Sequence, residues 1–431
     1  MVNLKIVKLK KEGILKNDNK GITLITLITT IIILLILAGI SITVLTGDNG
    51  LINKAAEAKN ATESANEKEE LEVAVTRLYD KRGNLDATKV VDGINKDIKN
   101  LNIVTATEGN FPVKVEYKNG HKYQITKDGD IMISVNAGDT APDDANAAYS
   151  SGDYTAIIPA GYTVSGTEVE TSIENGLVVR DSKQNEWVWI PVSTVEVETM
   201  YAKDSTGWKM GGTEVVTNYK TTGTYTRVNP GATTQYVYRE PDVLNNESYD
   251  GNPTNLAAAG FKNLTDMATN LRDDYKNMIE SIKQNGGFYV GRYELGKNTS
   301  DNNKPQVKKG TVMTMEGINW YNLYSACKSF SNGNVEARMI WGCQWDQICK
   351  FISTAKDANG DLIDLNDSRK YGNYKNSIPP ANENIGINRT TGVNEAWKTN
   401  NIYDLAGNHK EMSQEAYHSG SGRRAYFRRM S

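Results

Sequence analysis

The longest apolar run of the chain covers residues 22–45 and contains no charged side chain. At about 1.5 Å per residue, a helix over this range is roughly 36 Å long, which exceeds the ~30 Å of a bilayer core. The preceding residues, 1–21, hold six lysines and two acidic residues. The positive-inside rule therefore predicts one transmembrane helix over 22–45, a cytoplasmic N-terminus and an extracellular remainder.

Helical periodicity resumes after the turn-forming residues 46–50 and continues to about residue 82. Because charged residues of both signs surround its apolar positions, we expect a solvated stalk helix. Residues 84–135 then predict a helix followed by a small antiparallel sheet, with Asn119-Gly120 as a hairpin turn. The chain over 46–135 thus reads as a stalk and a small α/β module.

A polar, acidic stretch over 136–153 predicts a linker, and a larger domain follows over 154–431. This domain alternates short strands with turns, and apolar residues at helical spacing predict a helix over 264–283. A second helix, beginning near Arg338, would place three large apolar residues on one side. Residues 195–240 alternate weakly and predict a long hairpin insertion.

Composition narrows the classes of function. The formal charge is −3 and the isoelectric point is near 5.9, which gives no reason to expect a nucleic-acid partner. The three cysteines, Cys327, Cys343 and Cys349, allow at most one disulfide within the chain. They form no CxxC pair near histidines, which argues against a zinc site.

The residues Lys20 to Ile25, followed by the apolar run, resemble the prepilin leader of type IV pilins and pseudopilins in their Gram-positive variant. The resemblance implies a prepilin peptidase that cuts between Gly21 and Ile22, and other pilin-like subunits as partners. Pilins usually carry a glutamate at the position of Thr26, where it pairs with a neighbouring subunit's amine. Filament assembly is therefore an open question, and an ordinary signal anchor is the alternative.

Runs between residues 157 and 411 resemble, in order and spacing, landmarks of the formylglycine-generating enzyme and sulfatase-modifying factor family: 157–164, 176–179, 186–192, 287–294, 318–320, 338–346 and 401–408. That family has a variant of the C-type lectin fold, so the resemblance implies an α+β chain that ends in a lectin-like domain. Gly407 fits a turn that needs a positive φ or a close backbone approach. The landmark residues, which we expect to hold the fold together, are Arg292, Glu294, Trp320, Arg338, Trp345, Asp404, Gly407 and Asn408.

The related enzymes bind copper through a cysteine pair near the C-terminus, and thiolates suit Cu(I). This chain has no cysteine after Cys349, so we expect neither catalysis nor a cofactor. An enzyme of the formylglycine-generating class stays as the alternative. Loop carboxylates and amides at 357–361 and 366–367 make structural calcium a second alternative, although no glutamate ends the loop as in an EF-hand.

Retroelement-diversified proteins use the same lectin-like scaffold and display variable aromatic and polar residues near the C-terminus. Tyr417, His418, Tyr426 and Phe427 occupy the corresponding region, and tyrosine offers large contact area at low entropic cost. The tail departs from the family pattern, which suggests a missing last strand and an open sheet edge. We therefore expect a membrane-anchored, pilin-like surface protein with a non-catalytic domain that binds an extracellular ligand; a structural minor pilin is the other alternative.

Overall fold

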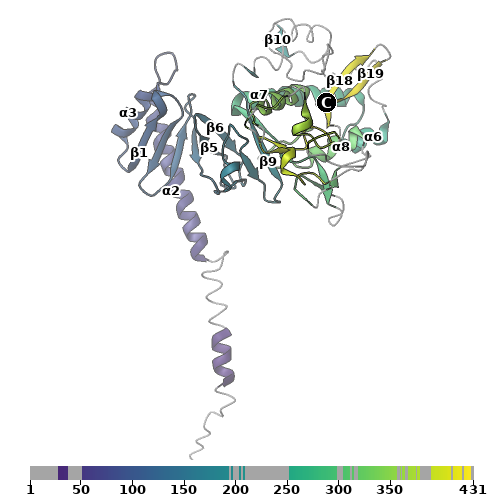
Figure 1. Ribbon diagram of the computed structural model, residues 1–431. Helices are drawn as coiled ribbons and strands as arrows, with labels where there is room; N and C mark the ends of the chain where they lie inside the picture. The colour runs from purple at the N-terminus through teal and green to yellow at the C-terminus, as the bar shows by residue number, and fades with distance from the viewer. Residues whose placement is uncertain are drawn as a thin grey trace, which may run out of the picture. The chain divides into compact units, whose positions relative to one another are not determined.

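In the computed structural model the chain comprises two compact units, residues 1–73 and 74–431 (Figure 1). The structure describes residues 28–36, 51–193, 196–197, 203–204, 207–208, 252–298, 304–310, 313–314, 319–356, 360, 362–364, 367–374, 376–378, 390–408, 411–419 and 422–428.

The first unit contains helical residues 28–36 and most of helix α2 (Leu51–Thr76). Within the described ranges, the helices are either too short or too polar to cross a bilayer. This finding corrects the prediction of a transmembrane helix over 22–45, together with the single-pass location derived from it. The described helical part of that range reaches only about 14 Å, and the remainder, with Gly21, Ile22 and Thr26, lies outside the described residues.

A six-stranded sheet in the order β1-β2-β3-β4-β5-β6 begins the second unit. Helix α3 (Ala87–Asp97) contacts β1 and β2, and the Asp86 side chain caps it by accepting from Lys89 N. The predicted hairpin turn at Asn119-Gly120 is confirmed, since Gly120 has a φ of 92° between β2 and β3. The strands are β1 (Leu101–Ala106), β2 (Val113–Tyr117), β3 (Lys122–Ile125), β4 (Ile131–Ser134), β5 (Ala147–Ser151) and β6 (Tyr154–Ile158).

The stretch 136–153 differs from the predicted linker because it contains β5. This strand pairs parallel with β4 and antiparallel with β6, so the sheet continues through the stretch. Ala147 and Ala148 are buried, although alanine carries little strand signal. Pairing partners on both sides therefore decide the conformation of β5.

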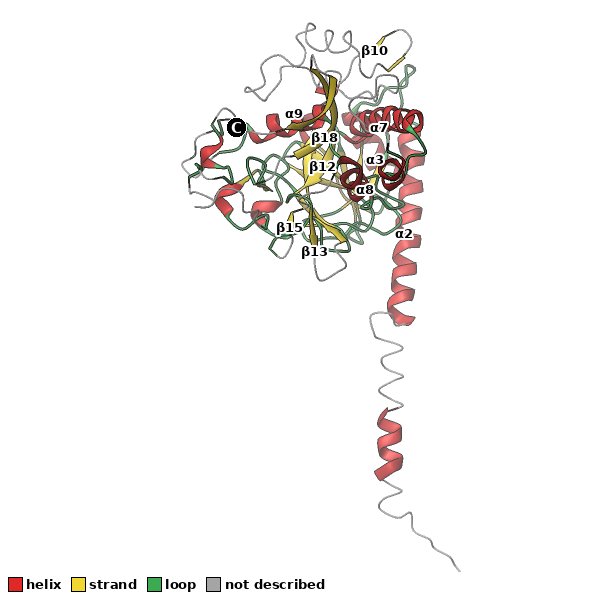
Figure 2. Cartoon of the chain, turned by 90° about the vertical axis from the view of Figure 1, so that its right-hand side faces the viewer, coloured by secondary structure: helices red, strands yellow, loops and turns green. Residues whose placement is uncertain are grey.

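A four-stranded antiparallel sheet in the order β12-β9-β8-β7 organises the rest of the unit. Figure 2 labels its edge strand β12, and helix α7 (Leu264–Asn285) contacts this strand. Helix α7 leads directly into β12, and Gly286 ends the helix with a left-handed φ of 73°. This confirms the predicted helix over 264–283. The strands are β7 (Thr163–Val164), β8 (Val178–Arg180), β9 (Glu186–Pro191) and β12 (Gly287–Gly291).

Helix α9 (Gly342–Ile352) begins four residues later than predicted, because the backbone N–H of Trp341 donates to the Gln344 side chain and caps it there. Trp341 and Trp345 are almost completely buried, in two neighbouring core clusters. Of the predicted hairpin over 195–240, only a few residues are described.

The other elements are α6 (Pro253–Ala258), α8 (Trp320–Lys328), β10 (Lys203–Asp204), β11 (Gly207–Trp208), β13 (Gly296–Asn298), β14 (Lys304–Gln306), β15 (Met313–Thr314), β16 (Lys398–Thr399), β17 (Ile402–Tyr403), β18 (Glu411–Ser419) and β19 (Gly422–Arg428).

Candidate functional site

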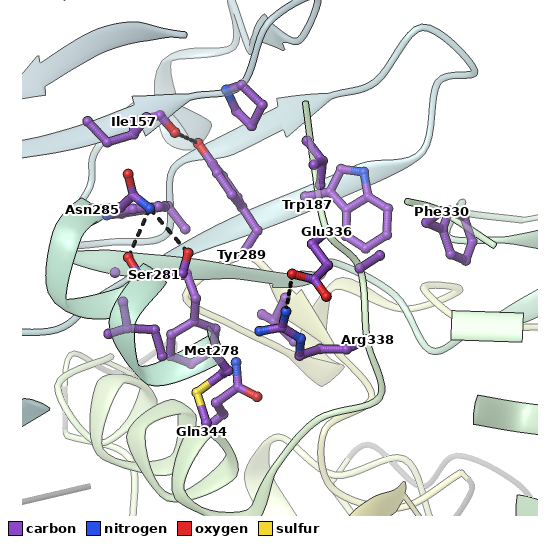
Figure 3. Close-up of a pocket in the computed structure, with 18 of the residues that line it drawn as sticks. Ile157, Trp187, Met278, Ser281, Asn285, Tyr289, Phe330, Glu336, Arg338 and Gln344 are labelled. Atoms are coloured by element: carbon purple, nitrogen blue, oxygen red, sulfur yellow. Dashed lines mark hydrogen bonds and ion pairs between the residues drawn. The ribbon is translucent and has the colours of Figure 1, made fainter. Parts of the chain in front are cut away.

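A cavity of about 280 Å³ lies inside the second unit, beside β12 (Figure 3). Most of its walls come from the β9–β12 pair, the C-terminal half of α7 and the irregular segment 330–340. Residues 157–162, Asn146 and Gln344 complete the lining. Ser281, Asn334 and Glu336 line it and are exposed, so the cavity opens to solvent. Concave sites that combine apolar walls with a few polar groups are typical of ligand binding.

One wall of the cavity is aromatic. Trp187 packs edge-on against Phe330 with ring centroids 5.2 Å apart, and Trp189 packs against Tyr289 at 4.9 Å. The Tyr289 hydroxyl donates to the carbonyl of Ile157 at 2.8 Å. Burial, with a smaller contribution from Tyr162, raises the pKa of Tyr289 well above its usual value. Tyr289 therefore stays a neutral hydrogen-bond donor.

The opposite wall carries a fixed guanidinium. Arg338 Nη2 lies 2.8 Å from Glu336 Oε2, and Arg338 Nε lies 3.1 Å from Asp274 Oδ1. Asp274 is only 5% exposed, and its Oδ2 accepts from Trp341 Nε1 and Gln414 Nε2. Carboxylates therefore hold Arg338 from two directions, and Arg338 is a charged residue of the cavity lining.

Asp274 is not among the residues that the sequence analysis singles out. A signal for it exists in the chain. Asp274 follows Leu271 by three residues and precedes Met278 by four, so it lies on the buried stripe of α7. A carboxylate on an apolar stripe indicates a buried partner, and here that partner is Arg338.

The four predicted ligand-binding residues lie together on the two-stranded ribbon β18–β19. Tyr417 pairs with Arg424, His418 with Arg423, and Phe427 with Met412, while Tyr426 precedes Phe427 on β19. Their side chains lie outside the description.

The ribbon is anchored to the core at its base. Trp320 Nε1 donates to the carbonyl of Ser413 at 3.2 Å, and Gln414 N donates to the carbonyl of Ile340 at 2.8 Å. Ile340 also lines the cavity. The base of the ribbon and the wall of the cavity therefore share one backbone contact.

Arg292 forms the centre of a buried ion-pair group apart from the cavity. Its Nη1 lies 2.7 Å from both Glu170 Oε1 and Glu186 Oε2. Arg180 pairs with the same two glutamates at 3.2 Å. Burial opposes the charge of Glu170, yet hydrogen bonds and charges from Ser165 and the two arginines leave its pKa below its usual value. This arrangement joins β8, β9 and the end of β12.

Asp404, Gly407 and Asn408 form a second structural group. Asp404 is fully buried and accepts from Asn373 Nδ2, Thr391 Oγ1 and Gly392 N at 2.7 to 2.9 Å. The Asn408 side chain donates to the Glu294 carboxylate. Of the eight landmark residues, Arg338 is the one that lines the cavity.

The glycine prediction is confirmed on both counts. Gly407 has a φ of 99°, and a Cβ at this position would lie 2.5 Å from the carbonyl oxygen of Asn373.

All three cysteines are free thiols, and burial raises the pKa of Cys327 to about 12. Within the described ranges there is no group of three His, Cys, Asp or Glu side chains arranged to hold a metal ion. Most of the predicted calcium loop at 357–361 and 366–367 lies outside the described residues. Asp367 is described, and it pairs with Arg369.

No family model matches this chain, and no curated protein or solved structure matches it either. The likeness to pilins and to the formylglycine-generating enzyme family therefore stays a prediction from the quoted motifs.

Proposed function

We propose that the region organised around the sheet β12-β9-β8-β7 is a lectin-like domain that binds a ligand without transforming it, and that the ligand enters the cavity beside β12. The observation that carries the proposal is the pairing of an aromatic wall with a fixed guanidinium across a solvent-open cavity. Aromatic rings supply contact area, and Arg338 supplies a charged group that carboxylates hold in place. The ribbon β18–β19, which carries the four predicted ligand-binding residues, adjoins the cavity wall through the backbone bond from Gln414 to Ile340.

Binding without chemistry is supported by how the polar groups of the cavity are used. Arg338 is held by two carboxylates, and the Tyr289 hydroxyl donates to a carbonyl. These groups stabilise the walls rather than exchange protons with a ligand. The cysteines do not line the cavity: Cys343 and Cys349 belong to the core around α9. The copper chemistry of the related enzymes would need a thiolate pair at the site.

A matched pair of variants on α7 tests the proposal. Ser281 is exposed and lines the cavity, whereas its neighbour Glu280 is exposed and does not. Ser281→Trp should fill the cavity mouth, and Glu280→Trp should add the same surface outside it. Neither change alters a buried residue, so both variants should keep the fold, which circular dichroism checks.

The full chain would be presented to a phage-displayed library of random linear peptides and to a glycan array. We expect it to retain at least one ligand, and we expect Ser281→Trp to weaken binding by about tenfold or more because the cavity is blocked. Glu280→Trp should bind like the parent. If the chain retains no peptide and no glycan, or if both variants bind equally well, the proposal is contradicted and a structural module without a ligand is favoured.

A further inference from the structure

Among the strands that the structure describes, β12 has a partner on one side only. It pairs antiparallel with β9, and no described strand pairs with its other side. Tyr289 faces Trp189 across this pair, and Trp189 N donates instead to Leu177 O, on the side of β8. Trp189 and Tyr289 are therefore a non-hydrogen-bonded pair.

The alternation along β12 follows from this pair. In an antiparallel ladder the backbone groups of successive residues point to opposite sides. Arg292 N, three residues after Tyr289, donates to Glu186 O at 3.0 Å, which agrees with this phase. The N–H and C=O groups of Gly287, Tyr289 and Gly291 consequently point away from β9.

The cavity borders the edge of β12 opposite β9 and reaches both faces of the sheet. All five residues of β12 line it, including Phe288 and Tyr289, whose side chains lie on opposite faces and pack in different core clusters. Segment 334–340 forms the far side and has no regular secondary structure. Over the described ranges, no backbone hydrogen bond joins this segment to β12.

We propose that the cavity takes an extended peptide segment, which adds to β12 as a further strand. This inference rests on the proposed function and names the class of its ligand. Backbone N–H and C=O groups need partners, and an unpaired edge is a template for a further strand. A five-residue strand is about 17 Å long, so the edge offers main-chain bonds at Gly287, Tyr289 and Gly291 to a short peptide.

The residues on the two faces of the sheet determine which side chains the peptide can carry at alternate positions. Alternate residues of an added strand would point toward Trp187 and Tyr289 on one face, and toward Phe288, Met278 and Ile282 on the other. Both surfaces are apolar. Arg338 is already paired with carboxylates, so the site creates no demand for a charged ligand. The expected ligand is an extended segment with apolar side chains facing both walls.

The experiment uses the full chain and a linear peptide selected from the phage library. A set of synthetic peptides would be made, each with a single backbone N-methyl group, so that the set covers every position of the selected sequence in turn. We expect methylation at every second residue to weaken binding by about tenfold or more, because those N–H groups donate to β12, while methylation between them is tolerated. Site-resolved hydrogen exchange gives a second readout: the amides of Gly287, Tyr289 and Gly291 should slow on peptide binding, and those of Phe288 and Val290 should not change.

Each other outcome overturns the inference in a distinguishable way. If only glycans bind, and Ser281→Trp abolishes their binding, the proposed function stands and the peptide class is wrong. If neither library yields a ligand, both fail. A selected peptide that tolerates methylation at every position does not bind as a strand. If the edge amides slow with rising protein concentration and no peptide, a second copy of this chain occupies the edge.

Discussion

Replacing Gly407 with alanine tests whether this turn depends on close backbone approach. The residue has a φ of 99°, and the added Cβ would lie 2.5 Å from the oxygen and 2.7 Å from the carbon of the Asn373 carbonyl. The left-handed backbone costs an alanine about 1–2 kcal/mol, and overpacking costs a further ~1–3 kcal/mol. Asn373 O also accepts from Asn408 N at 2.8 Å, so a shift to relieve the clash would strain that bond. We expect Gly407→Ala to lower the free energy of unfolding by about 2–5 kcal/mol.

Gly310→Ala is the matched control. Gly310 has a φ of 88°, and its added Cβ would meet no atom within 4 Å. Gly310→Ala should lower the free energy of unfolding only by the cost of the left-handed backbone, about 1–2 kcal/mol. The effect of alanine on the unfolded chain is similar in both variants and cancels in the comparison. Urea unfolding, followed by the fluorescence of the buried tryptophans, measures both losses. Equal losses would refute the argument that backbone contact with Asn373 requires glycine.

Two further predictions concern buried charges. Asp274→Asn should lower the free energy of unfolding by about 2–4 kcal/mol because it removes a buried charged partner of Arg338. The control Asp273→Asn, on the exposed face of α7, should change that free energy by less than ~0.5 kcal/mol. The same urea titration measures both variants, and similar losses would contradict a stabilising buried pair. The pKa of Glu170 beside Arg292 lies below the ordinary 4.5, so its stabilisation is complete above about pH 4.5 and is lost as the pH falls through the lower folded-state pKa. Thermal unfolding from about pH 6 to pH 2 should therefore show a shallower acid decline for Glu170→Gln than for the parent, and an unchanged decline would contradict the assignment.

The candidate site depends on parts of the chain that the sequence does not bring together. Trp187 and Tyr289 are about a hundred residues apart, and Arg338 lies further along. The motif resemblance indicates Arg338, but it does not include the partner Asp274. The identity of a buried carboxylate's partner depends on which segment packs beside it, here the irregular segment 330–340, and periodicity carries no such information.

Local chemistry in the sequence determined several elements directly. Asn119-Gly120 predicts a hairpin because this turn needs positive φ, and the turn is there. The apolar spacing of α7 predicts the helix, and Gly286 ends it because glycine adopts the left-handed conformation at low cost. These features depend on interactions between residues close in the chain, so the residue types and their spacing are enough to predict them.

Tertiary structure alone decided the rest. Residues 147–151 are rich in small and polar residues and predict a linker, yet pairing with β4 and β6 makes them a strand. The apolar run at 22–45 predicted a membrane helix, which the described residues do not support. The edge of β12 that has no described partner strand follows from which strands pair with it and from the path of segment 334–340. Strand neighbours are set by contacts distant in sequence, and for that reason the edge that we propose as a peptide site is visible only in the folded chain.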